Sequence, residues 1–416
     1  MGMCESKQEY LEHECLSSEL NEEFQFTRYL YEKEEVKLAL VIAIINKKDD
    51  AIFWAYELFY SGFKIELAEL LWKIYFDFYS TLNPSFEKYL KKKLIGNFCN
   101  NSDGEKLISM IINNFIIRPH NMDVFMLRQI AKTCDFDKQY LVGYKSVTNF
   151  NIIYKEILLA LETEDYLTLS SLICNDIFDS HLVLALEKIL GFFSNLGLKF
   201  NVSQILKEYQ KNIDCKNNPF KRIILLSKTI YYFTLIKQIP LGKNLYVHIE
   251  PEDIIIYENI CANLKEKGNG QLVPILPAYK ILPLAAIHFI DKENYLSLFK
   301  LKRDTIDIKN AYNYQWLYHA SFSPLWKERI EKFHGYVDKI NKIVIFDEIE
   351  DSDDNLQAFH NEFGYEPDEQ KTDIQMRTIQ EIKQVRDWSS FYKDHKNGGV
   401  VEIEEEILEV FDKIVY

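Results

Sequence analysis

Apolar side chains recur at the spacing of an α-helix through most of residues 34–240. Leu67, Leu71, Ile74 and Phe78, for example, fall on a single helical face. Segments with this pattern are about 12–16 residues long, and loops of about 2–8 residues separate them. Because short loops place successive helices side by side in opposite directions, the pattern predicts paired antiparallel helices in a solenoid or a bundle. No residue-level repeat of fixed period accompanies it, so it indicates no named repeat family.

The periodicity and the breaker residues together give the expected elements. Helices are expected at 34–46, 50–61, 65–80, 84–94, 103–118, 122–132, 151–161, 165–178, 181–195, 203–211, 220–238, 252–267, 285–300, 316–332 and 373–392, and short strands at 244–249 and 342–346. Asn83, Asp103 and Ser203 are expected to cap the N-termini of their helices, because their side chains can accept the first unpaired N–H groups.

Changes in charge, apolar pattern and proline content divide the chain into regions. Four are expected: an acidic flexible tail (1–33), a helical-repeat body (34–240), a second, mainly helical part (241–346) and an acidic C-terminal region with one helix (347–416). A break at 274–283 contains Pro274, Pro277 and Pro283, and proline lacks the amide donor that a long regular helix requires. We therefore expect a mainly all-α fold with a smaller α+β part towards the C-terminus.

The net charge of −14 argues at first against a nucleic-acid binder. Its distribution weakens that argument, because residues 1–35 carry a net −7 and residues 347–416 a net −13. The middle of the chain, 36–346, carries +6. The net charge of a whole chain bears on its solubility and association and does not give the sign of each region. Because the negative charge lies at the two ends, the basic middle of the chain is still compatible with nucleic-acid binding.

The basic excess is concentrated in residues 199–243, which hold nine lysine or arginine residues against Glu208 and Asp214. The candidate RNA-binding residues are Lys199, Lys207, Lys211, Lys216, Lys221, Arg222 and Lys228. Cations that follow phosphates, beside rings that stack on bases, suit single-stranded RNA. A second basic cluster, Lys88 with Lys91–Lys93, adjoins this segment only if the helices curve suitably.

Aromatic residues are interleaved with these cations, and they allow a second interpretation. They are Phe200, Tyr209, Phe220, Tyr231, Tyr232 and Phe233. Helical spacing explains them equally well as the core face of two helices whose lysines point to water. The sequence leaves both interpretations open.

Catalytic signatures are missing from the sequence. It contains no phosphate-binding loop, no dinucleotide fingerprint, no zinc-protease motif, no C-x-x-C pair and no nucleophile elbow. Its nine histidines and seven cysteines show no metal-ligand spacing. We therefore expect no catalytic residues, no metal and no cofactor, and a chain that is not an enzyme.

The apolar runs are too short for a membrane span. The longest, 39–45 and 281–290, fall below the roughly 20 residues that a transmembrane helix needs. The N-terminus has neither the basic nor the apolar region of a secretory signal. Seven scattered cysteines suit reduced thiols, so a cytosolic setting without membrane contact is expected.

Two blocks of sequence resemble a helical protein family of nucleocytoplasmic large DNA viruses of the mimivirus type. One block is FWAYELFYSGF (53–63) with its continuation at 70–90, and the other is FGYEPDEQ (363–370). Richness in Ile, Asn, Lys, Phe and Tyr fits an AT-rich viral genome. The resemblance spans about 34–392 and implies expression in the host cytoplasm, at the viral factory. It carries over no catalytic residue.

In architecture the chain also resembles the helical scaffold subunit of the cap-binding translation-initiation complex. That type of subunit joins a cap-binding protein to an RNA helicase and touches RNA, so the resemblance implies these partners. Its docking motif is a tyrosine, four residues, a leucine and an apolar residue, and Tyr89, Leu94 and Ile95 fit it. Tyr154 and Tyr279 begin looser matches. Tyr89 and Leu94 equally suit core positions of their helix, and a real motif would dock as a helix in a groove.

These observations predict a non-enzymatic helical scaffold or adaptor of a giant DNA virus, in contact with proteins and RNA, with a role in viral translation initiation as the narrower version. One alternative is a structural protein of the virion or of the viral factory. The other is an enzyme whose site assembles from distant segments.

Overall fold

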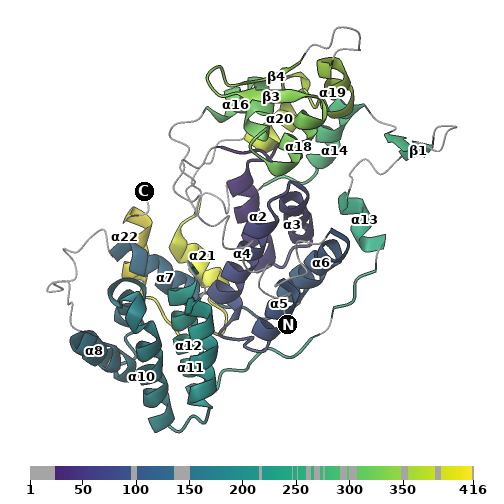
Figure 1. Ribbon diagram of the computed structural model, residues 1–416. Coiled ribbons are helices and arrows are strands. Elements are labelled where there is room, and N and C mark those ends of the chain that lie inside the picture. Colours follow the sequence, from purple (N-terminus) through teal and green to yellow (C-terminus); the bar gives the residue numbers. More distant parts are fainter. Residues whose placement is uncertain are drawn as a thin grey trace.

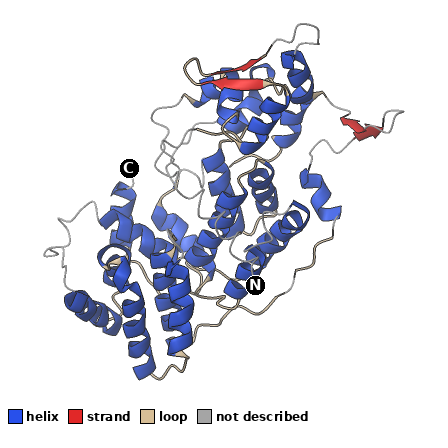
Figure 2. Cartoon of the chain, in the orientation of Figure 1, coloured by secondary structure: helices blue, strands red, loops and turns tan. Residues whose placement is uncertain are grey.

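Most of the described chain is helical, as its apolar periodicity predicts, and the computed structural model confirms a mainly all-α fold with a small α+β part (Figure 2). The structure describes residues 24–94, 101–134, 150–214, 218–245, 247–250, 252–258, 264–266, 272–274, 277–290, 298, 307–347, 355–379 and 386–414.

The helices of the body follow the expected order closely. They are α2 (Lys33–Ile45), α3 (Asp50–Tyr60), α4 (Lys64–Ile74), α5 (Phe86–Leu94), α6 (Asn101–Ile117), α7 (Asp123–Cys134), α8 (Phe150–Glu162), α9 (Tyr166–Ser171), α10 (Leu182–Asn195), α11 (Val202–Asp214) and α12 (Lys221–Ile236). α2 packs against α3, and α3 against α6. Two helices continue into π-helical turns, η2 (Tyr75–Tyr79) after α4 and η3 (Leu172–Asp176) after α9.

The remainder of the chain holds shorter elements. They are α13 (Glu252–Glu258), β1 (Leu264–Glu266), β2 (Leu272–Pro274), α14 (Ile281–Ala285), α16 (Ile308–Tyr314), α17 (Trp316–Ala320), α18 (Pro324–Lys332), β3 (Gly335–Asp338), β4 (Ile343–Phe346), α19 (Asn355–Phe363), α20 (Thr372–Ile379), α21 (Trp388–His395) and α22 (Glu405–Ile414). β1 pairs with β2 and β3 with β4, both antiparallel. Figure 1 shows α8, α10, α11 and α12 at one end and the β3–β4 hairpin with α16, α18 and α19 at the other.

The predicted boundary of the N-terminal tail at residue 33 is wrong. Leu30 and Tyr31 are buried, and the Tyr31 hydroxyl donates to the carbonyl of Ala285. The Trp326 indole N–H donates to the carbonyl of Thr27 at 3.1 Å. Residues 24–33 therefore pack between the body and the C-terminal part, because their apolar side chains and backbone groups find partners there. The expected flexibility of 1–23 lies outside the described residues.

Several predicted helices are shorter than expected, because side chains cap them early. The expected helix at 316–332 breaks at Ser323, whose hydroxyl accepts the N–H of Trp326 ahead of Pro324. The expected helix at 373–392 is also interrupted, and Asp387 caps the start of α21. The C-terminal region thus contains four helices among its described residues, α19 to α22, where one was predicted.

Other differences concern single elements. The helix expected at 252–267 ends at Glu258, and Leu264–Glu266 forms a strand instead. In the stretch expected as a helix at 285–300, Ala285 is instead the last residue of α14. At α11 the cap is Asn201, whose side chain accepts the N–H of Gln204 in place of Ser203. α6 begins at Asn101, two residues before the expected cap. The strand expected at 342–346 is confirmed as β4.

The expected strand at 244–249 is not formed in the described residues. The described residues 241–245 and 247–250, which we call the strap, have no regular secondary structure and lie between α12 and α13 (Figure 1). The Arg118 side chain forms hydrogen bonds with the strap's backbone, since it donates to the carbonyls of Lys243 and Leu245. The N–H of Gly242 donates to the carbonyl of Leu82 at 2.8 Å. A β-strand forms its hydrogen bonds with the backbone of a neighbouring strand. In the strap the Arg118 side chain and the Leu82 carbonyl form those bonds instead.

The four expected regions share one connected core. A single cluster of buried side chains reaches from Phe26 through the body to Phe411. The rings of Phe125 in α7 and Trp388 in α21, for instance, lie 5.7 Å apart. The acidic C-terminal region is accordingly packed on the body through α21 and α22.

Gly242 fits where no larger residue can. A Cβ atom at this position would lie 2.1 Å from Asn83 Oδ1, and the Asn83 amide is fixed by bonds to the carbonyls of Tyr79 and Pro119. We expect Gly242→Ala to lower the free energy of unfolding by about 1–3 kcal/mol through overpacking. Chemical denaturation of the full chain measures this loss.

Gly191 supplies the matched control. It lies within α10, and a Cβ atom there would meet nothing within 4 Å. Gly191→Ala should therefore raise the unfolding free energy by about 0.5–1 kcal/mol, since alanine is the better helix former. Equal effects of the two substitutions would contradict the close contact at the strap.

Candidate functional site

The predicted RNA-binding residues divide into exposed and ion-paired side chains. Lys199, Lys207 and Lys211 are exposed at or near α11. Lys221 and Arg222, at the start of α12, lie 3.7 and 3.1 Å from Asp179 carboxylate oxygens. Lys228 Nζ lies 3.9 Å from a carboxylate oxygen of Glu87, and Lys216 lies outside the described residues. The exposed members of the predicted set are therefore those of α11 and the residues just before it.

The aromatic residues of the same segment belong to the core. Tyr209, Tyr232 and Phe233 are buried, and the Tyr209 hydroxyl donates to the carbonyl of Lys221. The rings of Phe200 and Tyr232 pack against each other with centroids 5.2 Å apart. These rings are not available to stack on bases, so the interpretation of two amphipathic helices is correct for them.

The two lysine clusters lie on helices that side-chain contacts connect. α12 contacts α5 through Lys228 and Glu87 on one side, and it contacts α11 through Tyr209 and the Lys221 carbonyl on the other. Figure 1 also places α11 beside α12. We call the resulting surface the basic strip: Lys88, Lys91 and Lys92 of α5, Lys221 and Lys228 of α12, and Lys207 and Lys211 of α11. Of its seven lysines, Lys221 forms an ion pair with Asp179 and Lys228 forms one with Glu87.

Two residues of the predicted docking motif, Tyr89 and Leu94, pack against the protein's own core. Leu94 is 7% exposed, and Tyr89 is half-buried with its ring stacked on Phe86 at 5.5 Å. Ile95 lies outside the described residues. A partner could reach these anchors only if α5 left the core, so the helix-in-groove contact stays a prediction.

A buried ion pair joins three segments beside α13. Arg28 Nε donates to Glu57 Oε2 at 2.8 Å, and both side chains are almost fully buried. The other guanidinium nitrogens donate to the carbonyls of Tyr257 and Glu258 at the C-terminal end of α13. The last carbonyls of a helix need donors from outside it, and the guanidinium supplies donors to these two and fixes α13 in place. We call this arrangement the Arg28 clamp.

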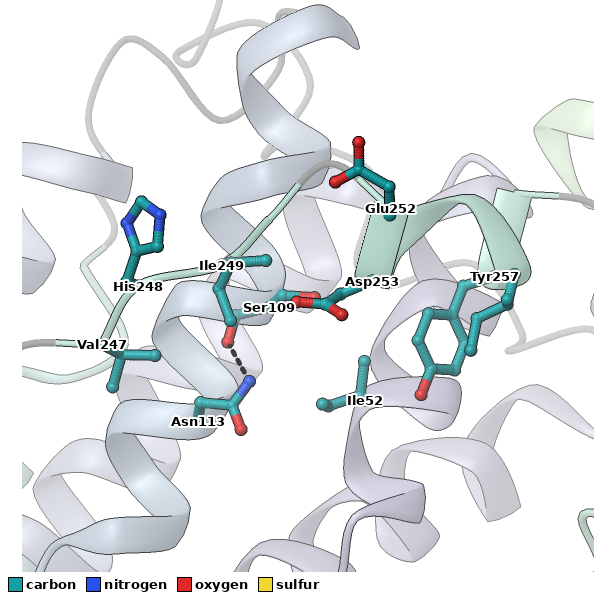
Figure 3. Close-up of a pocket in the computed structure, with 10 residues that line it drawn as sticks. Ile52, Ser109, Asn113, Val247, His248, Ile249, Glu252, Asp253 and Tyr257 are labelled. Atoms are coloured by element: carbon teal, nitrogen blue, oxygen red, sulfur yellow. Dashed lines mark hydrogen bonds between the residues drawn. The ribbon is translucent and has the colours of Figure 1, made fainter.

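A groove of about 490 Å³ opens next to the clamp (Figure 3). Its lining comes from α3 (Ile52), α6 (Ser109, Asn113), the strap (Val247, His248, Ile249) and α13 (Glu252, Asp253, Ile256, Tyr257). In Figure 3 Ile52 lies between Asn113 and the Tyr257 ring, and the Asp253 carboxylate is drawn beside Ser109. The groove therefore combines apolar, aromatic and acidic groups, and its volume lies within the roughly 300–1,000 Å³ of ligand pockets.

The polar groups of the groove suit binding better than catalysis. Ser109 Oγ shares a hydrogen bond of 2.8 Å with the Tyr56 hydroxyl. His248 Nε2 lies 2.8 Å from Glu250 Oε1 at the exposed rim. Burial raises the pKa of the Tyr257 phenol, and the charges of Asp49 and Asp253 raise it further. An acidic field beside an aromatic ring favours a cation over an anion.

A second buried ion pair lies where both π-helical turns meet α7. Arg128 donates through two nitrogens to both oxygens of Asp77, at 2.9 and 2.7 Å. Cys174 in η3 lies close enough to feel the same guanidinium, but burial raises the pKa of its thiol to about 11. The thiol is therefore a structural group rather than a nucleophile.

Asp123 holds the C-terminal segment on α7. The N–H of Val400 donates to its Oδ2 at 2.8 Å, and a Cβ at Gly399 would lie 2.1 Å from its Oδ1. Burial raises the pKa of Asp123 to about 7, although the N–H groups of Val400 and Val401 lower it. Nearby, burial lowers the pKa of His120 to about 4, and His395 contributes to the shift. These groups join separate segments of the chain.

The described residues form no group of three or more His, Cys, Asp or Glu side chains that could hold a metal ion. Among the described helices, none is alone long and apolar enough to cross a membrane, and one sharply bent pair, Tyr166–Asp176 with Asp179–Asn195, passes only when taken together.

Comparison with protein-family models, curated proteins and solved structures finds no match for this chain. The resemblance to a family of large DNA viruses, and to a translation-initiation scaffold, therefore stays a prediction.

Sequence reasoning missed the buried charges and the groove. Glu57, Asp77 and Arg128 each stand as a lone charge within a strongly apolar helical run. That pattern is itself a signal, because a charge among buried residues requires a partner. The groove left no comparable signal, since its residues come from four separate elements.

The Arg28 clamp predicts a large cost for losing the guanidinium. Arg28→Ala leaves Glu57 buried without its partner, so the unfolding free energy should fall by about 3–5 kcal/mol. Hydrogen exchange of the α13 amides should also accelerate, because two carbonyls at the end of α13 lose their donors. Lys327→Ala is the control, since the Lys327–Glu331 pair is exposed and its loss should not measurably change either quantity.

The raised pKa of Asp123 predicts a dependence of stability on pH. The folded state holds this proton up to about pH 7, whereas the unfolded carboxyl releases it near its ordinary pKa of 3.8. The contribution of Asp123 to stability is therefore greatest below pH 3.8 and falls as pH rises towards 7, by up to about 4 kcal/mol.

Asp123→Asn removes this dependence while keeping an oxygen for the N–H of Val400. The variant should gain unfolding free energy relative to the natural protein as pH rises from about 4 to about 8, in denaturation series at each pH. The exposed Asp373→Asn variant controls for the general change in charge. A difference between Asp123→Asn and the natural protein that stays constant across this range would refute the assignment.

Proposed function

We propose that this chain is a non-enzymatic helical scaffold that binds single-stranded RNA along the basic strip. The observation that supports this most is the connection of three lysine-bearing helices, α5, α12 and α11, whose opposite faces are fixed in the core. Fixed helices carry their cations in a defined arrangement, and backbone phosphates are recognised through such cations.

The buried ionisable groups support a scaffold rather than an enzyme. Arg28, Arg128 and Asp123 each bind a group of another segment, so their role is to connect elements. The groove beside α13 offers no activated nucleophile. The giant-virus origin, the cytoplasmic setting and the contact with a cap-binding protein and an RNA helicase form the narrower version of the proposal, which rests on the resemblance alone.

A structural role in the virion or the viral factory is the second candidate. It shares the absence of catalytic motifs, and abundance of the chain in purified particles would favour it. RNA binding that depends on the basic strip would favour the scaffold.

Charge reversal on the strip tests RNA binding. We choose Lys91, Lys92 and Lys207, because all three are exposed, whereas Lys221 and Arg222 also hold Asp179. The triple glutamate variant should bind a fluorescein-labelled oligouridine at least about tenfold more weakly at low salt, measured by fluorescence anisotropy. The slope of log affinity against log salt should also become shallower by about 0.7 for each phosphate that the variant no longer neutralises.

The control changes the net charge equally at a distance from the strip. Lys309, Lys327 and Lys371 are exposed in the C-terminal part, and their glutamate variant should bind as the natural protein does. Equal losses in the two variants, or no binding by the natural protein at low salt, would rule out the strip as an RNA site.

A further inference from the structure

We propose that the groove between α3, α6, the strap and α13 binds a basic segment of a partner protein, in which lysine or arginine side chains alternate with apolar ones. This goes beyond RNA binding, because the groove has a different chemistry and different residues from the basic strip.

The charge of the groove selects a cation. Glu250, Glu252 and Asp253 line or flank one side, and Asp49 lies close enough to act on the Tyr257 phenol. These carboxylates repel phosphate, so RNA is excluded as the occupant. The Tyr257 ring stands among them, and a lysine or arginine head over its face gains from both the ring and the carboxylates.

The apolar surface selects a protein rather than a small cation. Ile256 lines the groove and is 60% exposed, and its neighbour Ile255 is 52% exposed. Ile52, on α3, adds apolar surface to the opening. Exposed apolar side chains rimmed by charge are typical of protein-interaction sites, so the occupant must bring apolar side chains as well as cations.

A second copy of this chain fits less well. Its densest run of lysines in a described helix lies in α5, where the neighbouring Leu90 and Leu94 are buried in the core. That helix can offer charge to the groove but neither of these leucines. The turn between β3 and β4 presents Lys339 and Lys342 beside the exposed Ile340, but the pairing of the two strands holds it as a tight hairpin rather than an extended segment. A separate partner segment can present both.

The Arg28 clamp makes the groove a preformed site. It anchors the C-terminal end of α13, while Arg118 fixes the strap on the opposite side. The Tyr257 ring is also stacked on Tyr56 of α3, with centroids 5.2 Å apart. Because the walls are held before binding, the partner does not have to order them.

The test uses the full chain and two labelled peptides, one of repeated Lys-Leu and one of repeated Glu-Leu. The natural protein should bind the lysine peptide at least about tenfold more tightly in fluorescence anisotropy. The Glu252→Gln, Asp253→Asn double variant should lose about tenfold of that affinity. Ile256→Ser should lose about fivefold, and this loss should persist at high salt because apolar contact is not screened.

The matched control is Glu328→Gln with Glu331→Gln, two exposed acids on α18, which should leave peptide binding unchanged. Equal affinity for the two peptides, or unchanged affinity in the groove variants, would overturn the proposal. Self-association of the natural protein that the groove variants abolish, seen by light scattering, would assign the groove to a second copy instead. A loss of oligouridine binding in the groove variants would assign it to the RNA surface.

Discussion

The arrangement of the molecule depends on one buried guanidinium. Arg28 comes from a segment that precedes the first helix of the body, and it binds Glu57 of α3 together with two backbone carbonyls at the end of α13. An ion pair of this kind contributes little net stability compared with an apolar replacement, since two charges lose their water. Its geometric demands are strict, however, and here they set where three distant segments meet. The placement of α13, and with it one wall of the groove, follows from that meeting.

The same principle recurs elsewhere in the core. Asp77 and Arg128 join the π-helical turn η2 to α7, and Asp123 joins α7 to the C-terminal segment at Val400. Each pair places a charged or polar group where apolar packing alone would leave several orientations of neighbouring helices equally favourable. Apolar contact then supplies most of the stability, and the buried polar contacts select among arrangements. The surface is thereby free to carry two regions of opposite charge.

Helix content could be predicted from the sequence because the 3.6-residue period reports which face of each segment is buried. The ends of the helices were harder to predict. Ser323 and Asp387 each cap a new helix within a long periodic stretch, and the apolar period carries no information about such local hydrogen bonds. The strand predicted in the strap is absent from its described residues. Polar and apolar side chains alternate there as in a strand, but the backbone carbonyl of Lys243 accepts from Arg118 and not from a second strand. At the candidate site, the lysines of α11 and α12 could be foreseen. The groove could not, because Ile52, Ser109 and Tyr257 are brought together only by long-range packing.

The bonds of the N-terminal segment also bear on how the chain acquires its structure during synthesis. The contact between the Trp326 indole and the Thr27 carbonyl spans 299 residues, and that between Gln25 and the Phe322 carbonyl spans 297. A ribosome must therefore complete most of the chain before Gln25 and Thr27 can find these two partners, whereas Arg28 already has Glu57 nearby in the sequence. Until then the rings of Phe24 and Phe26 lack the cover that His319 and Tyr312 give them in the folded protein. Such a protein folds late and as a whole, and its nascent form presents an apolar surface of the kind that chaperones bind.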